Sequence, residues 1–207
     1  MSATVVILAL TVLVSVLAFR DRRLFDTLAF EPFVVHARRD LHRFVTHALV
    51  HADWPHLFVN MYVLYGFGPF VEGYLTGLTP LPGSWLFVIL YVTAAVVACV
   101  PGYGRHKHDP RYRAVGASGA VSAVLFAHIL ILPTAEVGLF LLPIGLPSAV
   151  FGALYLIYEG TMHRRGGDHV AHDAHLMGAL HGVLFMVVLR PALVPAFFRS
   201  LTELLPG

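Results

Sequence analysis

Three groups of polar residues stand out in a chain that is otherwise strongly apolar. His56 and Asn60 are four residues apart, so they share one face of a helix. Ser118 lies in the small-residue segment 116–119, and His175 follows much later in the chain. A serine hydroxyl is a weak nucleophile until a neighbouring base accepts its proton, which a neutral imidazole does near neutral pH. These residue types predict acyl transfer by Ser118 with His175 as the general base.

Attack by a serine on a carbonyl produces an oxyanion, which needs hydrogen-bond donors aimed at it from a preorganised site. The imidazole N–H of His56, the amide of Asn60 and the backbone N–H of Ser118 could supply those donors. No acidic residue is placed to orient His175, because Asp173 is close in sequence but lies on a different helix face. The pattern therefore predicts a Ser–His dyad rather than a triad.

The composition indicates a membrane protein. Of 207 residues, 57% are hydrophobic and only 13% are charged, whereas a soluble domain carries about 25% charged residues. The formal net charge of +2 does not indicate a nucleic-acid partner. The single Cys99 allows no disulfide framework and leaves the redox compartment open.

Six segments are long and apolar enough to be membrane-spanning helices of roughly 20 residues. The first has no Lys or Arg ahead of it and ends in a basic cluster, so we expect a retained span rather than a signal peptide. A long polar loop, 20–55, follows it and is expected to form its own interfacial structure. The chain is thus expected to be a single all-α membrane domain, 1–207, with spans at about 3–19, 56–75, 84–101, 116–133, 137–158 and 172–190.

Alternating spans would bring the polar groups together. The starts of the second, fourth and sixth spans would lie on the same side of the membrane, and each carries one of the three groups. Small residues at four-residue spacing, as at Ala174, Gly178 and Gly182, let helix backbones approach closely. Packing alone explains these glycines but not the accompanying hydroxyl and imidazoles, and polar groups at membrane depth indicate function.

The order of these motifs resembles the rhomboid intramembrane serine proteases. His56 and Asn60, then the segment 116–119, then His175 with its following glycines each begin an even-numbered span, and the similarity covers about residues 40–190. It extends to the Phe67-Gly68 pair and Glu72.

This resemblance implies a six-transmembrane-helix rhomboid-like bundle and an intramembrane serine endopeptidase that cleaves transmembrane segments of membrane proteins, with no metal or cofactor. Ser118 would be the nucleophile and His175 the general base. His56 and Asn60 would be oxyanion donors, with Gly116 shaping the oxyanion hole. Span five and the loop 159–171 would gate the lateral approach of a substrate helix.

Two features depart from the family pattern. Many rhomboids carry an aromatic residue one turn after the nucleophile, packed on the catalytic imidazole, whereas this chain has Ser122. This change is expected to affect the orientation of His175 without removing either reactive group. A Trp-Arg pair in the first loop is also not evident.

Structural interpretations compete for several residues. Ser118 taken alone would be a small hydroxyl at a close helix crossing. His181 lies on a different face from His175, so we expect it to pack or to hydrogen-bond between helices. Two groups have spacings that could bind a metal, but no Cys or closed ligand set accompanies them, and solvated or interfacial histidines are favoured. These groups are the cluster Asp168, His169, His172 and Asp173, and the pair His47 and His51.

Two other functions are alternatives to the protease. A catalytically silent rhomboid-like protein would bind transmembrane clients without cutting them, but it would be expected to lose the serine or the histidine. A small transporter with a histidine relay would place polar groups at the midplane and show inverted repeats. The expected partners are therefore transmembrane protein substrates and the lipid bilayer, and no nucleic acid.

The distribution of Lys and Arg favours a membrane orientation opposite to that of typical rhomboids. Lys and Arg concentrate in the loops after spans one, three and five, so the positive-inside rule would place the mouth of the site in the cytoplasm. Rhomboids typically open the site to the outside. We expect the family orientation in a multi-pass protein of the plasma (inner) membrane, because the counted loops double as folded catalytic structure. The basic residues on the loop side are Arg20, Arg22, Arg23, Arg38, Arg39, Arg43, Arg105, Lys107, Arg111, Arg113, Arg164 and Arg165, against Arg190 and Arg199 on the other.

Overall fold

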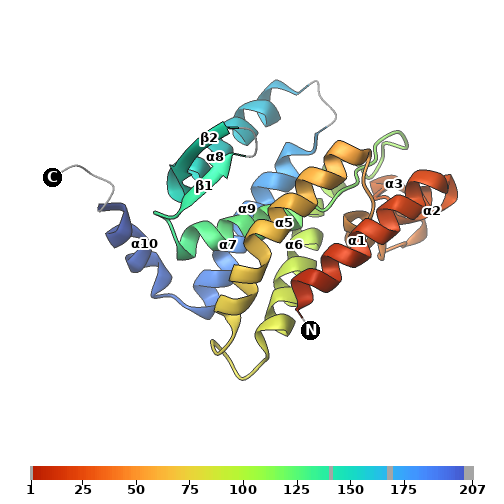
Figure 1. The fold of residues 1–207 in the computed structure, drawn as a ribbon. Helices are drawn as coiled ribbons and strands as arrows, with labels where there is room; N and C mark the ends of the chain where they lie inside the picture. Colours follow the sequence, from red (N-terminus) through yellow and green to blue (C-terminus); the bar gives the residue numbers. More distant parts are fainter. Residues whose placement is uncertain (1, 140–141, 167–169, 203–207) are drawn as a thin grey trace.

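The computed structural model describes residues 2–139, 142–166 and 170–202, which form mainly helices (Figure 1). Within these described residues, three helices are long and apolar enough to cross a membrane: α1 (Ala3–Arg20), α6 (Gly83–His106) and α9 (His172–Leu189). The bundle also contains α5 (Trp54–Leu75) and a shorter apolar helix, α7 (Ser118–Ile131). The expectation of a mostly helical membrane protein is confirmed.

The fifth predicted span, 137–158, is wrong in its first half. Residues there form an antiparallel hairpin of β1 (Glu136–Leu139) and β2 (Leu142–Pro147), in which Glu136 pairs with Pro147. Prolines at 143 and 147 remove backbone donors and clash with the preceding helical turn, so this stretch cannot continue as a helix. The helix of this region, α8, begins only at Ser148 and runs to Arg165.

Helix α7 occupies the centre of the bundle. Every residue from 119 to 130 is buried, and the helix packs against α5, α6 and α9. It is shorter than the predicted span 116–133 because Gly116, before it, has a positive φ that is not helical, and Pro133 follows it. Fourteen residues give a length of about 21 Å, against a hydrocarbon core of about 30 Å. The start of α7 is thus expected to lie below the membrane surface.

Helix α9 approaches α7 closely along a stripe of glycines. A Cβ at Gly178 would overlap the carbonyl oxygen of Gly119, and one at Gly182 would overlap that of Ala123. Backbone therefore packs on backbone, as the small-residue spacing predicted. Since His175 lies one turn before Gly178, this crossing sets its distance from the start of α7.

The N-terminus of α1 is capped by a carboxylate from another helix. Glu72 of α5 accepts hydrogen bonds from the backbone N–H groups of Ala3 and Thr4 and from the hydroxyls of Ser2 and Thr4, at 2.7–2.9 Å. A carboxylate at this end satisfies unpaired N–H groups and complements the helix dipole. The contact ties α1 to the end of α5.

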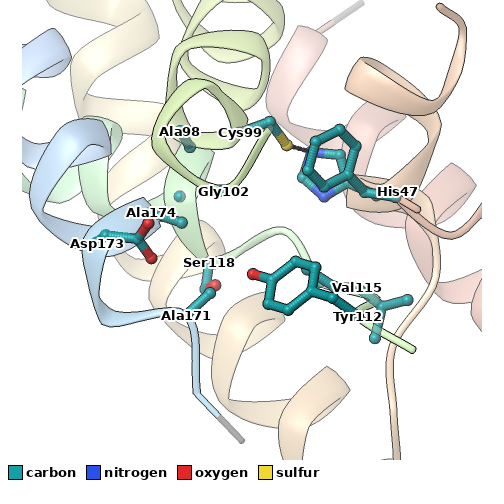
Figure 2. Close-up of a pocket in the computed structure, with 14 residues that line it drawn as sticks. His47, Ala98, Cys99, Gly102, Tyr112, Val115, Ser118, Ala171, Asp173 and Ala174 are labelled. Atoms are coloured by element: carbon teal, nitrogen blue, oxygen red, sulfur yellow. Dashed lines mark hydrogen bonds between the residues drawn. The ribbon is translucent and has the colours of Figure 1, made fainter. Parts of the chain in front are cut away.

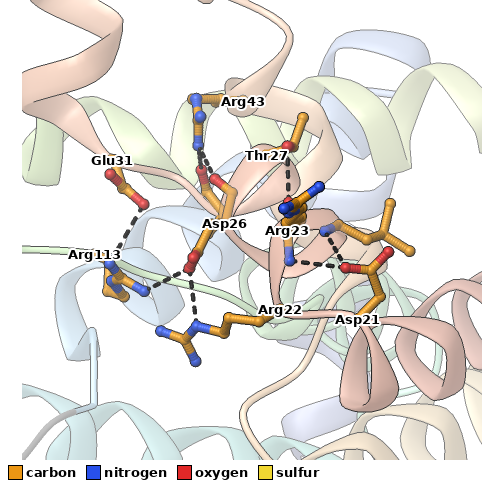
Figure 3. A network of polar contacts seen from close by, with 10 residues as sticks. Asp21, Arg22, Arg23, Asp26, Thr27, Glu31, Arg43 and Arg113 are labelled. Carbon is orange, nitrogen blue, oxygen red and sulfur yellow. Dashed lines mark hydrogen bonds and ion pairs between the residues drawn. The ribbon is translucent and has the colours of Figure 1, made fainter.

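The long first loop contains helices of its own, and its place at the membrane interface stays a prediction. It contains α2 (Arg22–Leu28), α3 (Pro32–Arg38), α4 (Arg43–Thr46) and the 3-10 turn η1 (His47–Leu49). Arg43 is buried and donates to the carbonyls of Asp26 and Ala29 at 2.7 and 2.6 Å. Arg113, from the loop before α7, pairs with Asp26 at 2.9 Å and with Glu31 at 3.6 Å (Figure 3). These contacts join the two loops that surround the start of α7.

The chain continues beyond the last predicted span. After α9, residues 193–202 form α10 (Leu193–Thr202), an additional short helix. It packs against α7 and α9, away from the first loop (Figure 1).

Candidate active site

Ser118 and His175 are in contact at the starts of α7 and α9. Ser118 is the first residue of α7, and His175 lies one turn into α9. The Oγ atom of Ser118 lies 2.8 Å from Nε2 of His175, so the predicted contact is present. For Nε2 to accept the hydroxyl proton, the ring proton of His175 must lie on Nδ1.

The first loop holds the backbone that leads into Ser118. The Gly116 N–H donates to the carbonyl of His47 at 3.0 Å, and the Ala117 N–H donates to Nε2 of His51 at 3.3 Å. Because that nitrogen accepts, the ring proton of His51 lies on Nδ1, which is 3.0 Å from Oγ of Ser15 on α1. The two residues before Ser118 are thus fixed by elements far away in sequence.

Both loop histidines are held neutral by burial. Burial lowers the pKa of His47 from 6.5 to about 4. Burial, together with the nearby imidazoles of His56 and His47, lowers the pKa of His51 to about 3. His47 also lies 3.1 Å from Sγ of Cys99. The two histidines therefore have different partners: His51 contacts Ser15 and Ala117, and His47 contacts Cys99. These contacts do not indicate a metal ion shared by the pair.

The predicted oxyanion donors gather beside the loop before Ser118. Gly116 has φ +112°, which favours glycine, and a Cβ there would lie 2.7 Å from Nε2 of His56. Asn60 is buried and donates one amide hydrogen to the His56 carbonyl at 3.0 Å, which leaves its second hydrogen for another acceptor. The Ser118 N–H belongs to the first turn of α7, where N–H groups have no intrahelical acceptor.

A small cavity of about 30 Å³ opens beside Ser118. Figure 2 shows Ser118 facing it, with His47 and Cys99 on one side and Asp173 on another. This volume holds about two water molecules. Burial raises the pKa of Tyr112, which also lines the cavity, to about 12, so its hydroxyl stays a neutral hydrogen-bonding group.

An acidic residue lies beside His175, contrary to the sequence-based expectation. It is Glu159 of α8, whose Oε1 lies 3.0 Å from Nδ1 of His175 and whose Oε2 lies 2.5 Å from Nδ1 of His172. The Oε1 contact has the distance of a hydrogen bond, but the N–H of His175 is not aligned with it. Asp173 faces elsewhere, as predicted, and pairs with Arg105.

Comparison with known proteins agrees with this arrangement. The family model described as Rhomboid domain matches residues 38–192, more than half of the chain. The chain belongs to the rhomboid family. It is 32% identical over 152 residues to RHOMBOID-like protein 12, mitochondrial, of Arabidopsis thaliana, a match that covers 67% of this chain and 44% of that protein.

Two further relatives show similar coverage. The chain is 31% identical to Presenilin-associated rhomboid-like protein A, mitochondrial, of Danio rerio, over 63% of this chain and 33% of that protein. It is 29% identical to Rhomboid-related protein 1 of Caenorhabditis elegans, over 74% of this chain and 41% of that protein. The matches thus span less than half the length of these curated relatives.

An aromatic ring from another helix lies near His175, although residue 122 is a serine. Ser122 hydrogen-bonds the hydroxyl of Tyr155 on α8 at 2.7 Å, and the Tyr155 ring centroid lies 6.5 Å from that of His175. Tyr155 and Glu159 are four residues apart, so both face His175 from one side of α8. Sequence reasoning placed Glu159 in a loop. Its four-residue spacing from Tyr155 was the signal that could have found it.

One group of described residues has the spacing of metal ligands. Glu159, His172 and His175 offer ligand atoms within 4.8 Å of one another. However, two atoms that both ligate tetrahedral zinc lie about 3.3 Å apart, whereas His172 and Glu159 are 2.5 Å apart, a hydrogen-bond distance. Of the other metal candidates, Asp168 and His169 lie outside the described residues.

His181 takes the interhelical role expected for it. Its Nε2 lies 2.8 Å from Oγ1 of Thr93, so it joins α9 to α6. Of these two histidines of α9, His175 is the one that contacts Ser118.

Proposed function

We propose that this rhomboid-family protein is an intramembrane serine endopeptidase, with Ser118 as nucleophile and His175 as general base. The observation that carries the proposal is the 2.8 Å contact between Oγ of Ser118 and Nε2 of His175, two residues 57 positions apart. A hydroxyl and an imidazole in that relation form an activated nucleophile. The first-turn position of Ser118 adds a backbone N–H without an intrahelical acceptor, which is available to the oxyanion.

The reaction follows from this geometry. Oγ of Ser118 forms a bond to the scissile carbonyl carbon while its proton moves to Nε2 of His175. The oxyanion accepts hydrogen bonds from the Ser118 N–H and from the side chains of His56 and Asn60. Collapse breaks the C–N bond, and His175 gives its proton to the leaving amine. Water, activated by His175, then hydrolyses the acyl-enzyme and restores the hydroxyl of Ser118.

The proposed membrane arrangement uses six spans: α1, α5, α6, α7, α8 and α9. The starts of α5, α7 and α9 would then share one side, with Ser118 recessed below the surface by the shortness of α7. Substrates would be transmembrane segments of other membrane proteins. They would approach past α8, which packs mainly on α9 and exposes Leu154 and Ile157.

The identity of the membrane stays a prediction. The sequence favoured a plasma (inner) membrane with the site facing outside. Two of the relatives are mitochondrial by name, which does not agree with that expectation. The proposed chemistry is the same in either membrane, because it depends only on the recessed site.

Labelling with a fluorophosphonate tests the nucleophile directly. The purified full-length protein should be labelled, and Ser118→Ala should abolish the labelling because the reacting oxygen is gone. His175→Ala should lower the labelling rate by about 100-fold or more. Both variants should also lose cleavage of a single-span test substrate in proteoliposomes.

The same experiment separates a protease from a silent client-binding protein. The proposal fails if the parent protein is not labelled, or if Ser118→Ala still cleaves the substrate. Binding of the test substrate without labelling would support the silent alternative. A Ser84→Ala variant is the matched control, since it removes a serine hydroxyl at the start of α6, whereas the α6 residues that line the cavity beside Ser118 lie near the end of that helix.

A further inference from the structure

The buried carboxylate of Glu159 lies between two imidazoles. Its side chain is 5% exposed, and each of its oxygens faces one histidine of α9. Oε2 lies 2.5 Å from Nδ1 of His172, and Oε1 lies 3.0 Å from Nδ1 of His175. A carboxylate so deeply buried is stable only with such partners.

The atom of His175 that faces Glu159 is the one that must carry the ring proton. Nε2 of His175 lies 2.8 Å from Oγ of Ser118. To accept the hydroxyl proton there, the neutral imidazole must carry its own proton on Nδ1. An acceptor next to Nδ1 favours that tautomer and opposes rotation of the ring. It also stabilises the imidazolium that forms when Ser118 attacks.

His172 fixes the carboxylate in turn. Its side chain is 3% exposed, and its short contact to Oε2 holds Glu159 from the first turn of the same helix that carries His175. The Oε2 atom of Glu159 is therefore held by His172, and its Oε1 atom can accept a hydrogen bond from Nδ1 of His175. The misaligned N–H of His175 fits this state, because catalytic hydrogen bonds often align only when substrate is bound.

A second residue of α8 supports the same interpretation. Tyr155, one turn before Glu159, is anchored to Ser122 of α7 at 2.7 Å and places its ring beside His175. Helix α8 thus contributes both a charge and an aromatic neighbour to the imidazole.

We propose that Glu159 is a positioning residue for His175, held in place by His172, so that the catalytic chain runs Ser118–His175–Glu159–His172. This inference rests on the proposed function. It makes the reaction depend on a helix that carries neither reactive group, because α8 must be docked on α9 for His175 to be oriented. A merely structural role for Glu159 would instead pin α8 to α9 without affecting the chemical step.

The test measures kcat and KM for a single-span substrate, together with thermal unfolding, in the full-length protein. Glu159→Gln keeps the size of the side chain but removes its charge, and should lower kcat by about 100-fold with little change in KM. Glu159→Asp keeps the charge and should recover part of the lost kcat. His172→Gln should lower kcat less than Glu159→Gln, because the carboxylate remains.

The matched control is Glu136→Gln, the same chemical change at an exposed site on β1. It should leave kcat unchanged. Parent-like kcat in Glu159→Gln, or equal losses in the Gln and Asp variants, would overturn the inference while Ser118 labelling still supports the protease. A parent protein that is not labelled would overturn both. If Glu159→Gln unfolds, the comparison is made between Glu159→Asp and His172→Gln. The inference is overturned if Glu159→Asp is folded and its kcat is equal to or lower than that of His172→Gln.

Discussion

At the scale of single residues, two histidines of the first loop hold the backbone that leads to Ser118, one through its carbonyl and one through its imidazole. His47 offers its carbonyl to Gly116, and His51 accepts the N–H of Ala117. The second contact requires an unprotonated Nε2, so protonation of His51 would break it. Burial prevents that protonation at neutral pH by keeping the pKa of His51 near 3. The backbone before Ser118 thus depends on the charge state of a loop histidine.

This dependence predicts acid sensitivity. The pKa values of His47 and His51 are about 4 and about 3 in the folded protein, against 6.5 when exposed. Between these values the unfolded chain binds protons that the folded one does not, so stability is full above pH 6.5 and falls as the pH drops. From pH 7 to pH 5 the two groups together remove up to about 4 kcal/mol. Thermal unfolding in detergent at pH 7, 6 and 5 measures the effect.

A His51→Gln variant is the control for this prediction. It removes one of the two titrating groups, so its melting temperature should fall about half as steeply between pH 7 and pH 5. A melting temperature independent of pH in the parent protein would contradict the prediction. An unchanged slope in His51→Gln would show that other groups cause the acid sensitivity.

At the scale of elements, the crossing of α7 and α9 decides whether the two reactive groups meet. Gly178 and Gly182 bring α9 against the carbonyls of Gly119 and Ala123. One turn before this contact, His175 reaches Ser118. The close crossing is therefore part of the proposed catalytic geometry as well as of the fold.

Enlarging a glycine at this crossing should separate the pair. Gly178→Val places side-chain atoms where the Gly119 carbonyl lies, and overpacking of this kind costs about 2 kcal/mol, or about 4–8 °C in melting temperature. The displaced His175 should lower the rate of fluorophosphonate labelling by about 100-fold. Labelling kinetics and thermal unfolding are measured on the same sample.

Leu180→Val, at an exposed position of α9, is the matched control and should change neither quantity. Parent-like labelling in a folded Gly178→Val protein would show that the crossing has room to adjust. This result would contradict the proposal that the glycines set the distance between His175 and Ser118.

At the scale of the whole molecule, the basic loops are part of the folded structure. Arg43 donates to backbone carbonyls, Arg113 pairs with Asp26 and Glu31, and Arg105 pairs with Asp173. Such arginines are already neutralised or hydrogen-bonded, so they are poor indicators of the cytoplasmic side. This supports giving the family orientation more weight than the charge count.

The orientation can be tested by cysteine labelling. The only native cysteine, Cys99, is buried, so the parent gives a low background. In intact spheroplasts a membrane-impermeant maleimide should label Arg111→Cys, in the loop before α7, and should not label Thr76→Cys, in the loop after α5. Both native side chains are exposed. The opposite pattern would show that the positive-inside rule prevails.

The sequence by itself determined the membrane character and predicted which residues would be reactive. Ser118, His175, His56 and Asn60 could be found because polar side chains at membrane depth contradict the apolar pattern around them. Helical spacing then placed His56 and Asn60 on one face. These are local properties that need no knowledge of which helices touch.

Only the tertiary structure decided that Glu159 faces His175. A carboxylate at the end of an apolar segment has the pattern of a boundary residue, and its direction depends on how α8 is rotated and tilted against α9. That rotation is set by packing between residues distant in sequence. It also depends on the hairpin before α8, because the helix begins only after it, at Ser148. Spacing along one helix cannot report a distance between two helices, which is why the sequence predicted a dyad.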